Sequence, residues 1–426
     1  MTSSVDCEKI NLDPIDWPYL TFEIPGIAGF FKSSFEDFRV EEVPAYSPCG
    51  MGEHIYVHIE KEGMATQQAV QRIARELKIS PHSVGIAGLK DARGIARQWL
   101  SVQKVSVQDL EHLQIPGMKV LAISRHRNKL RVGHLRGNHF VIKLRGCSED
   151  DREKVTAVLQ ILSELGVPNY FGPQRFGMRG DNWQVGLALL EQDYATAARW
   201  IAGFPQDTDK GSILRARELF EAQNYPEASL TWPSEFRDPI RLCRVMNKTG
   251  GDAKRALDSL GNEKLWFYLT AFQSRLFNDV LAERLTTFNR VQSGDLAYKH
   301  ENGAVFLVED ASREQARAAR FEISPSGPLF GYGMTEPQGE PQRLERQVLA
   351  MTGLQKSDFR QSGILKCKGE RRSLRFRMED LKIQNDSDPK GDYLELQFFL
   401  PRGCYATAVL REIGKGQLRE GKPASL

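Results

Sequence analysis

The sequence predicts an α+β fold in which a β-rich domain is interrupted by an inserted, mostly helical one. Two observations support this. Short extended segments fill the chain up to about residue 145, helical spacing dominates from 168 to about 365, and alternating apolar residues return at 394–400. In addition, 426 residues are enough for two domains, and 41% hydrophobic with 27% charged residues is ordinary for a globular protein.

The first part of the chain reads as strands with two helices. Residues 1–25 lack periodicity and are expected to be a weakly ordered lead-in. A helix is predicted after Thr66, with Ala69, Ile73 and Leu77 on its apolar face, and another after Ser148, ending at Gly166. Strands are predicted at 29–32, 38–43, 54–59, 84–87, 99–102, 120–123, 130–132 and 140–145.

The remainder is predicted mainly from spacing and from Gly and Pro content. Residues 264–285 form the clearest long helix, and 321–342, with many Gly and Pro, are expected to be an ordered loop. Residues 371–377 alternate Arg with apolar residues, as an edge strand with a basic face does, so phosphate contact is one hypothesis for them. A closing helix is predicted at 406–413.

Positive charge is concentrated in one region. Residues 90–145 hold twelve Lys and Arg against three acids, a net of +9 in a chain whose total is +3. A solvated surface usually mixes both signs, so this region favours contact with a nucleic acid, and Trp99 and Phe140 within it could stack on bases.

One carboxylate lies at the start of this basic region. Asp91 belongs to the glycine-rich turn 88–94, between two predicted strands. A carboxylate held among cations stays ionised and can act as a nucleophile or a base, although an Asp in such a turn more often bonds to nearby backbone.

Asn138 and Phe140 are two residues apart at a strand start, so they share a face. Asn could read the edge of a uracil and Phe could stack on its ring; the alternative is a turn Asn followed by a core Phe.

Other kinds of site are poorly supported. The pair His54 and His58 lies on a strand pattern, which favours solvated positions over a metal site. The acids Glu36, Asp37, Glu41 and Glu42 cluster, but such acids are usually solvated and no sugar-stacking aromatics accompany them, so a glycosidase is rejected. No phosphate-loop, dinucleotide or zinc-deaminase motif is present.

The cellular setting is indicated by what the sequence lacks. Six scattered cysteines without a CxxC pair fit a reducing cytosol. There is no apolar run of membrane-spanning length and no secretory signal pattern. A cytoplasmic protein without a membrane segment is expected.

Several segments, taken together and in order, resemble the TruD family of tRNA pseudouridine synthases. The resemblance covers roughly residues 28–413 and is carried by Lys32 with 36–42 (EDFRVEE), 85–91 (GIAGLKD), 130–131 (LR), 137–140 (GNHF), 167–177 (VPNYFGPQRFG), 272–274 (FQS) and 400–407 (LPRGCYAT). It implies a pseudouridine-synthase catalytic domain, a mixed and largely antiparallel sheet flanked by helices, with an inserted TRUD α/β domain. The implied boundaries are a lead-in at 1–27, catalytic parts at 28–167 and 368–426, and the insert at 168–367.

The resemblance also implies an activity and a set of residues. The activity is isomerisation of uridine-13 in the D arm of tRNA, with no metal, organic cofactor or obligatory protein partner. By motif position, Asp91 is the catalytic aspartate and nucleophile, and Lys32 is its ion-pair partner. The uridine-site residues are Phe38, Asn138, Phe140 and Tyr405, the last at a position where the family motif can carry Phe.

The chemistry leaves two routes open. A uridine must leave its stack to expose the glycosidic bond and C5, and one ionised carboxylate then either adds to the base or removes a sugar proton while a glycal forms. Two other functions remain: a non-catalytic RNA-binding module, which would not need the carboxylate or the Asn-x-Phe pair, and a related enzyme that acts on further RNAs such as mRNA.

Overall fold

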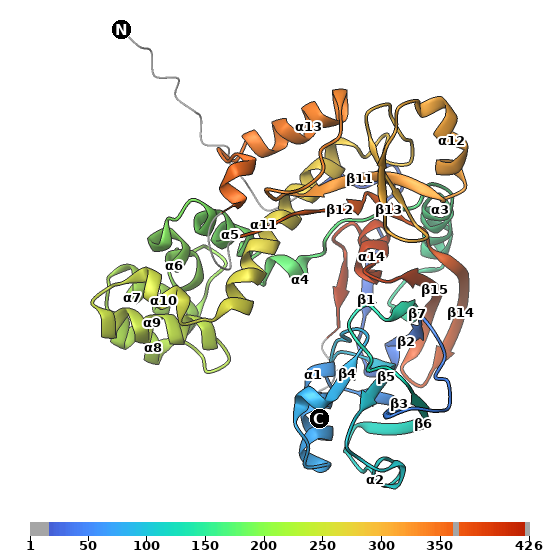
Figure 1. Ribbon diagram of the computed structural model, residues 1–426, viewed down its shortest axis with the longest axis horizontal. Coiled ribbons are helices and arrows are strands. Elements are labelled where there is room, and N and C mark those ends of the chain that lie inside the picture. The colour runs from blue at the N-terminus through green and yellow to red at the C-terminus, as the bar shows by residue number, and fades with distance from the viewer. Residues whose placement is uncertain (1–16, 361–365, 422–426) are drawn as a thin grey trace. The chain divides into compact units, whose positions relative to one another are not determined.

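A computed structural model describes residues 17–360 and 366–421 (Figure 1). The chain divides into two compact units: unit 1 comprises Met1–Pro18 and Pro168–Arg375, and unit 2 comprises Tyr19–Val167 and Phe376–Leu426. Unit 2 is therefore assembled from two distant stretches of chain, and most of unit 1 is the segment between them. The second junction follows Arg375, whereas the sequence placed it at 367/368.

Unit 2 is built on a ten-stranded mixed sheet. Its strands are β1 (Gly29–Phe31), β2 (Phe38–Pro44), β3 (His54–Glu62), β4 (Val84–Ile86), β5 (Ile95–Val102), β6 (Met118–His126), β7 (Leu135–Arg145), β14 (Glu379–Asp388), β15 (Gly391–Pro401) and β16 (Leu418–Glu420). The main order is β14-β15-β7-β2-β5-β3-β6, with β4 on β5 and β1 between β7 and β16. The pairs β2–β5 and β1–β16 are parallel and the others antiparallel. The predicted mixed, largely antiparallel sheet is confirmed.

Helices flank this sheet in two places. They are α1 (Thr66–Glu76), α2 (Val107–Glu111), α3 (Glu149–Leu165) and α14 (Ala406–Gly414), with the 3-10 turns η1 (Phe35–Asp37) and η2 (Pro81–Ser83). The apolar faces of α3 and α14 share a core with β2, β7 and β15, in which Leu162 and Val409 lie among Ile142 and Phe398. A second core joins α1 and α2 to β3, β5 and β6.

Unit 1 is mostly helical and carries a small sheet. Its elements are α4 (Pro173–Phe176), α5 (Asn182–Leu190), α6 (Tyr194–Ala202), α7 (Gly211–Glu221), α8 (Tyr225–Thr231), α9 (Arg237–Thr249), α10 (Ala253–Asp258), α11 (Asn262–Glu283), α12 (Ala311–Ala319), α13 (Gly339–Ala350), η3 (Lys356–Phe359), β9 (Leu296–Lys299), β10 (Val305–Leu307), β11 (Ile323–Leu329) and β12 (Glu370–Ser373). The sheet order is β10-β9-β11-β12. The strands β8 (Val167–Pro168) and β13 (Arg375–Phe376) lie where the chain passes between units. The long helix predicted at 264–285 is confirmed as α11.

Two predicted elements are wrong. Residues 130–132 are not a strand: after β6 the chain turns, and Gly133 N–H donates to the carbonyl of Ala87 at 2.8 Å. The segment 321–342 is not all loop, because it contains β11, which pairs with β9 on one side and β12 on the other.

Several residues expected to be solvated are buried. Asp37 and Glu42 are buried and ion-paired with Arg145 and Lys90. His54 is also buried, and His58 stacks on Trp99 with ring centroids 4.8 Å apart. The burial of the two acids depends on partners distant in the chain, which the local strand pattern does not show.

The basic face predicted at 371–377 and the weakly ordered lead-in also need correction. The side chain of Arg371 is 4% exposed and pairs with Glu345 at 2.7 Å, and Arg375 is buried. In the lead-in, Thr21 is buried and its backbone N–H donates to Glu412 Oε2 at 3.0 Å, while Ile27 lies in the core beside α14. Residues 1–16 lie outside the described residues.

Candidate active site

Asp91 lies on the loop between β4 and β5, with 62% of its side chain exposed. The neighbouring Lys90 points inward, and its Nζ is 2.7 Å from Oε2 of Glu42 on β2. The other oxygen of Glu42 accepts the backbone N–H of Trp99 on β5 at 3.3 Å. Since both side chains of this ion pair are buried, it fixes the loop to two strands and leaves Asp91 facing solvent.

A second buried cation, Lys61, lies under the same loop. Its ammonium donates to the carbonyls of Asp91 at 3.0 Å and Lys90 at 3.4 Å, and also to that of Met64. Burial lowers the pKa of Lys61 to about 8, and the charge of Asp91 opposes this shift. Thr66 adds a further contact, because its Oγ1 accepts the N–H of Lys90 at 2.8 Å.

Lys61 was not predicted as a site residue, although the sequence contains a signal for it. In β3 the alternating residues Ile55, Val57 and Ile59 are buried in one core, and Lys61 is next in the same series. A lysine at an inward strand position must be paired or bonded, so it marks a built-in polar site.

Lys32 lies immediately after β1 and reaches the Asp91 carboxylate. Its Nζ is 3.9 Å from Asp91 Oδ2 and 3.2 Å from Glu420 Oε1, and only 3% of its side chain is exposed. The Lys32 backbone is left-handed, with φ of 58°, a conformation that is costly for a residue with a side chain. The predicted contact with Asp91 is present, but the closer partner is Glu420, which the sequence did not indicate.

Phe38 and Phe140 lie on one face of the sheet beside Lys32. Their rings meet edge to face with centroids 6.0 Å apart, and the Lys32 ammonium is 4.5 Å from the Phe38 centroid. Both rings are mostly buried in the core shared with α3 and α14, as the core alternative for Phe140 expected. The ammonium and the two rings thus form one side of the site.

Asn138 shares this face, because it is two residues from Phe140 on β7, and it lies in the strand rather than in a turn. Its Oδ1 is buried and has no hydrogen-bond partner among the described residues. Buried amide oxygens are normally bonded, so this one can accept a hydrogen bond from a bound molecule.

Tyr405 lies at the start of α14, just beyond β15, and is 45% exposed. The end of β15 runs beside Asn138, since Leu400 pairs with Asn138 and Pro401 with Gly137. The structure therefore connects Lys32, Asp91 and the two phenylalanines by direct contacts, and it places Asn138 and Tyr405 at one end of a strand pair.

Some cations of the basic region form ion pairs within the protein. Lys90 is paired with Glu42, and Arg145 with Asp37 at 2.7 Å. In contrast, Arg125 and Arg127 at the end of β6 and Arg131 in the following turn are exposed. The surface able to meet an anion is thus smaller than the count of twelve cations indicates.

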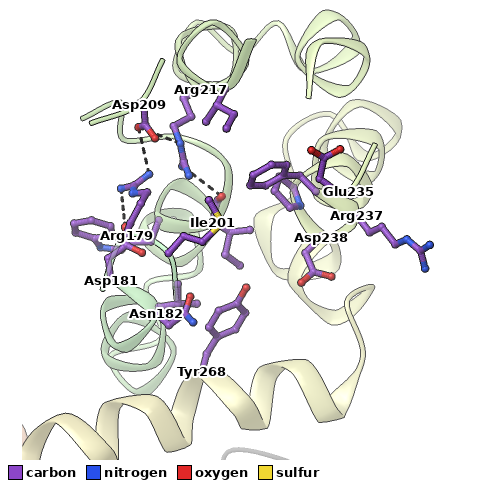
Figure 2. A pocket seen from close by; sticks show the side chains of 16 residues that line it. Arg179, Asp181, Asn182, Ile201, Asp209, Arg217, Glu235, Arg237, Asp238 and Tyr268 are labelled. Atoms are coloured by element: carbon purple, nitrogen blue, oxygen red, sulfur yellow. Dashed lines mark hydrogen bonds and ion pairs between the residues drawn. The ribbon is translucent and has the colours of Figure 1, made fainter. Parts of the chain in front are cut away.

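A separate pocket of about 440 Å³ lies among the helices of unit 1 (Figure 2). Its lining includes three arginines, three aspartates and a glutamate, and four of these groups pair with each other: Arg179 with Asp181 at 2.7 Å and Arg217 with Asp209 at 3.2 Å. None of the predicted site residues lines this pocket, and its paired charges leave little net attraction for phosphate.

Within 17–360 and 366–421, no three His, Cys, Asp or Glu side chains gather as a metal site would need. No helix in the described part of the chain is both long and apolar enough to cross a membrane.

Comparisons with known proteins give a consistent result. A family model described as tRNA pseudouridine synthase D (TruD) matches residues 14–413. The chain is 44% identical over 398 residues to a tRNA pseudouridine synthase D of Geotalea daltonii, covering 93% of this chain and 99% of that protein. It is 37% identical over 412 residues to a protein of the same name from Thermus thermophilus, covering 94% of this chain and 93% of that protein. A crystal structure assigned to tRNA pseudouridine synthase D (TruD) of Methanosarcina mazei superposes with a TM-score of 0.76 at 26% identity, over 94% of this chain and 96% of that one.

Proposed function

The chain belongs to the tRNA pseudouridine synthase D (TruD) family, and on that premise we propose that it converts uridine-13 in the D arm of tRNA to pseudouridine, with Asp91 as the catalytic carboxylate. The observation that carries this proposal is the setting of Asp91: an exposed carboxylate on a loop fixed by buried groups, 3.9 Å from a buried ammonium. Such a group is oriented by a cation and open to a substrate.

The reaction rearranges one nucleotide. The bond from the sugar C1′ to N1 breaks, a bond from C1′ to C5 forms, the C5 proton leaves and N1 takes up a proton. Asp91 serves either by adding to the base or by removing a sugar proton as a glycal forms. Because the product has the composition of the substrate, no co-reactant is consumed, and we propose that neither a metal nor an organic cofactor takes part.

The remaining residues suit a flipped-out uridine. The open Oδ1 of Asn138 would accept the N3–H of uracil, and the aromatic residues Phe38, Phe140 and Tyr405 would line the base site. Lys32 would orient the Asp91 carboxylate. The exposed Arg125 and Arg127 would contact the tRNA backbone. We place the reaction in the cytoplasm, with tRNA as the partner and no protein partner required.

The test is Asp91→Asn, assayed on a tRNA transcript whose uridines are tritiated at C5. Isomerisation releases that tritium to water, so release measures chemistry directly. We expect the rate to fall at least about 10³-fold, as when a catalytic carboxylate is removed, while tRNA binding is nearly unchanged. Asp392→Asn, at an exposed aspartate at the start of β15, is the matched control and should keep full activity.

An Asp91→Asn protein that releases tritium at the wild-type rate would overturn the assignment of the carboxylate. The position is tested separately, by mapping pseudouridine in total RNA from cells that lack the protein. Loss confined to the tRNA D arm supports the narrow function, and loss in mRNA or other RNAs supports the broader one.

A further inference from the structure

The Asp91 site contains a second carboxylate, supplied by the last described strand. Glu420 on β16 contacts two cations at once: Lys32 Nζ at 3.2 Å through Oε1, and Arg93 Nη1 at 2.5 Å through Oε2. Arg93 lies two residues from Asp91 on the same loop. Glu420 therefore engages the cation that reaches the Asp91 carboxylate, Lys32, and a second cation two residues from Asp91 along the chain.

The pairing of β16 with β1 fixes the position of Glu420. The strand β16 runs parallel to β1, with Glu420 opposite Phe31, the residue before Lys32. Gly421 N–H then donates to the Phe31 carbonyl at 2.8 Å, and a Cβ at Gly421 would lie 2.6 Å from Ser33 Cα. The close approach that only glycine permits keeps the strand against the segment carrying Lys32.

The turn before β16 is equally specific. Lys415 and Gly416 are both left-handed, with φ of 43° and 85°, and Gln417 N–H donates to the Gly414 carbonyl at 2.8 Å. This turn reverses the chain after α14 and directs it along β1. A defined turn and strand pairing therefore place Glu420 next to Lys32. Glu420 lies beyond residue 413, where the family match ends.

The charges explain what Glu420 contributes. Lys32 is buried and needs an anion, but the Asp91 oxygen is 3.9 Å away and mostly exposed. A tight Lys32–Asp91 pair would hold the carboxylate that the reaction needs free, because a paired carboxylate is a weaker nucleophile and base. Burial tends to raise the pKa of Glu420, but Lys32 and Arg93 outweigh it and keep the pKa below the usual value.

We infer that Glu420 is a positioning residue for the reaction: it holds Lys32 and Arg93 so that they surround the Asp91 carboxylate without pairing tightly with it. The inference rests on the proposed role of Asp91. Glu420 contacts the protein's own cations, so its loss should change the rate of the chemical step more than the binding of tRNA.

The test compares Glu420→Gln and Glu420→Asp in the full chain, with Glu153→Gln, an exposed glutamate on α3, as the control. Tritium release under saturating and limiting transcript gives kcat and KM for each. We expect Glu420→Gln to lower kcat by about 10- to 100-fold, the range for a misplaced reacting group, with KM nearly unchanged. Glu420→Asp should regain most of the rate because it keeps the negative charge.

Each other outcome overturns the inference. An unchanged kcat shows that Glu420 is dispensable, and a raised kcat shows that it competes with Asp91 for Lys32. A change in KM alone assigns Glu420 to RNA binding, and equal loss in the Gln and Asp variants with a lowered Tm assigns it to folding. Because tritium release counts any uridine, the comparison holds even if the target is not uridine-13. A wild-type protein that releases none would instead overturn the proposed function, and this inference with it.

Discussion

The buried ion pair between Lys90 and Glu42 gives the sharpest stability prediction. At the observed 2.7 Å, the two charges attract by about 6 kcal/mol at an effective dielectric constant of about 20. Desolvation of both groups offsets much of this, so the pair itself adds little. Removing one partner is different, because Lys90→Met leaves Glu42 buried with the N–H of Trp99 as its remaining donor. We expect Lys90→Met to lower the free energy of unfolding by about 3–5 kcal/mol.

The assay is urea unfolding of the full chain, together with amide hydrogen exchange of residues 84–102, which reports on the loop and its two strands. The double variant Lys90→Met/Glu42→Gln removes the buried charge but keeps an acceptor for Trp99, so it should recover at least half of the loss. Arg343→Met on α13 is the control, since it breaks an exposed ion pair with Glu340 and should leave the unfolding midpoint in place.

Two results would refute this reasoning. One is a loss of less than about 1 kcal/mol in Lys90→Met, the value of an exposed pair. The other is a double variant whose loss in free energy of unfolding equals the sum of the losses in the two single variants, since the two groups would then act independently. In either case the loop that carries Asp91 would have to be held by other contacts, such as those of Lys61.

Two further predictions concern the cations of unit 2. Because the pKa of Lys61 is lowered from 10.5 to about 8, the unfolded chain binds more protons than the folded protein between these pH values. The free energy of unfolding should therefore rise with pH in this window, by about 3 kcal/mol relative to Lys61→Met. Urea unfolding of both proteins at several pH values measures this difference. A flat difference between the two proteins would contradict the burial of a charged Lys61. For the exposed cations, changing Arg125, Arg127 or Arg131 to Gln should weaken tRNA binding and lower the slope of log affinity against log salt by about 1 each, measured by filter binding. The control, Arg152→Gln on α3, should change neither, and an equal effect there would contradict a local RNA surface.

The sequence predicted elements well where a pattern is long and local. The strands β3, β7 and β15 and the helix α11 follow from spacing that continues over several residues. The strand β11 was not predicted because Pro325, Gly327 and Pro328 lie within it. Pro325 lacks an N–H, but its carbonyl accepts the N–H of Leu374 at 2.9 Å, so tertiary pairing overrides the local preference against a strand.

The residues of the candidate site likewise include some that a local sequence pattern reveals and one that it does not. Asp91 and Lys32 were found through motifs, and their contact is present. Lys61 could have been found from its inward strand position. Glu420 could not, because its contact with Lys32 joins residues 388 positions apart and depends on a strand register that no local pattern encodes.

The pairing of β7 with β15 has a consequence for how the protein is made. Asn138 lies opposite Leu400, and the whole of 168–375 stands between them in the chain. At about 5–20 residues per second, a ribosome needs on the order of 10–40 s to synthesise that insert. Until it has done so, the edge of β7 that pairs with β15 stays unpaired, and Lys32 lacks its closest anion until Glu420 emerges. Early folding of the insert while still on the ribosome would bring the two halves of the sheet together, so translation speed and chaperone access bear directly on the yield of active enzyme.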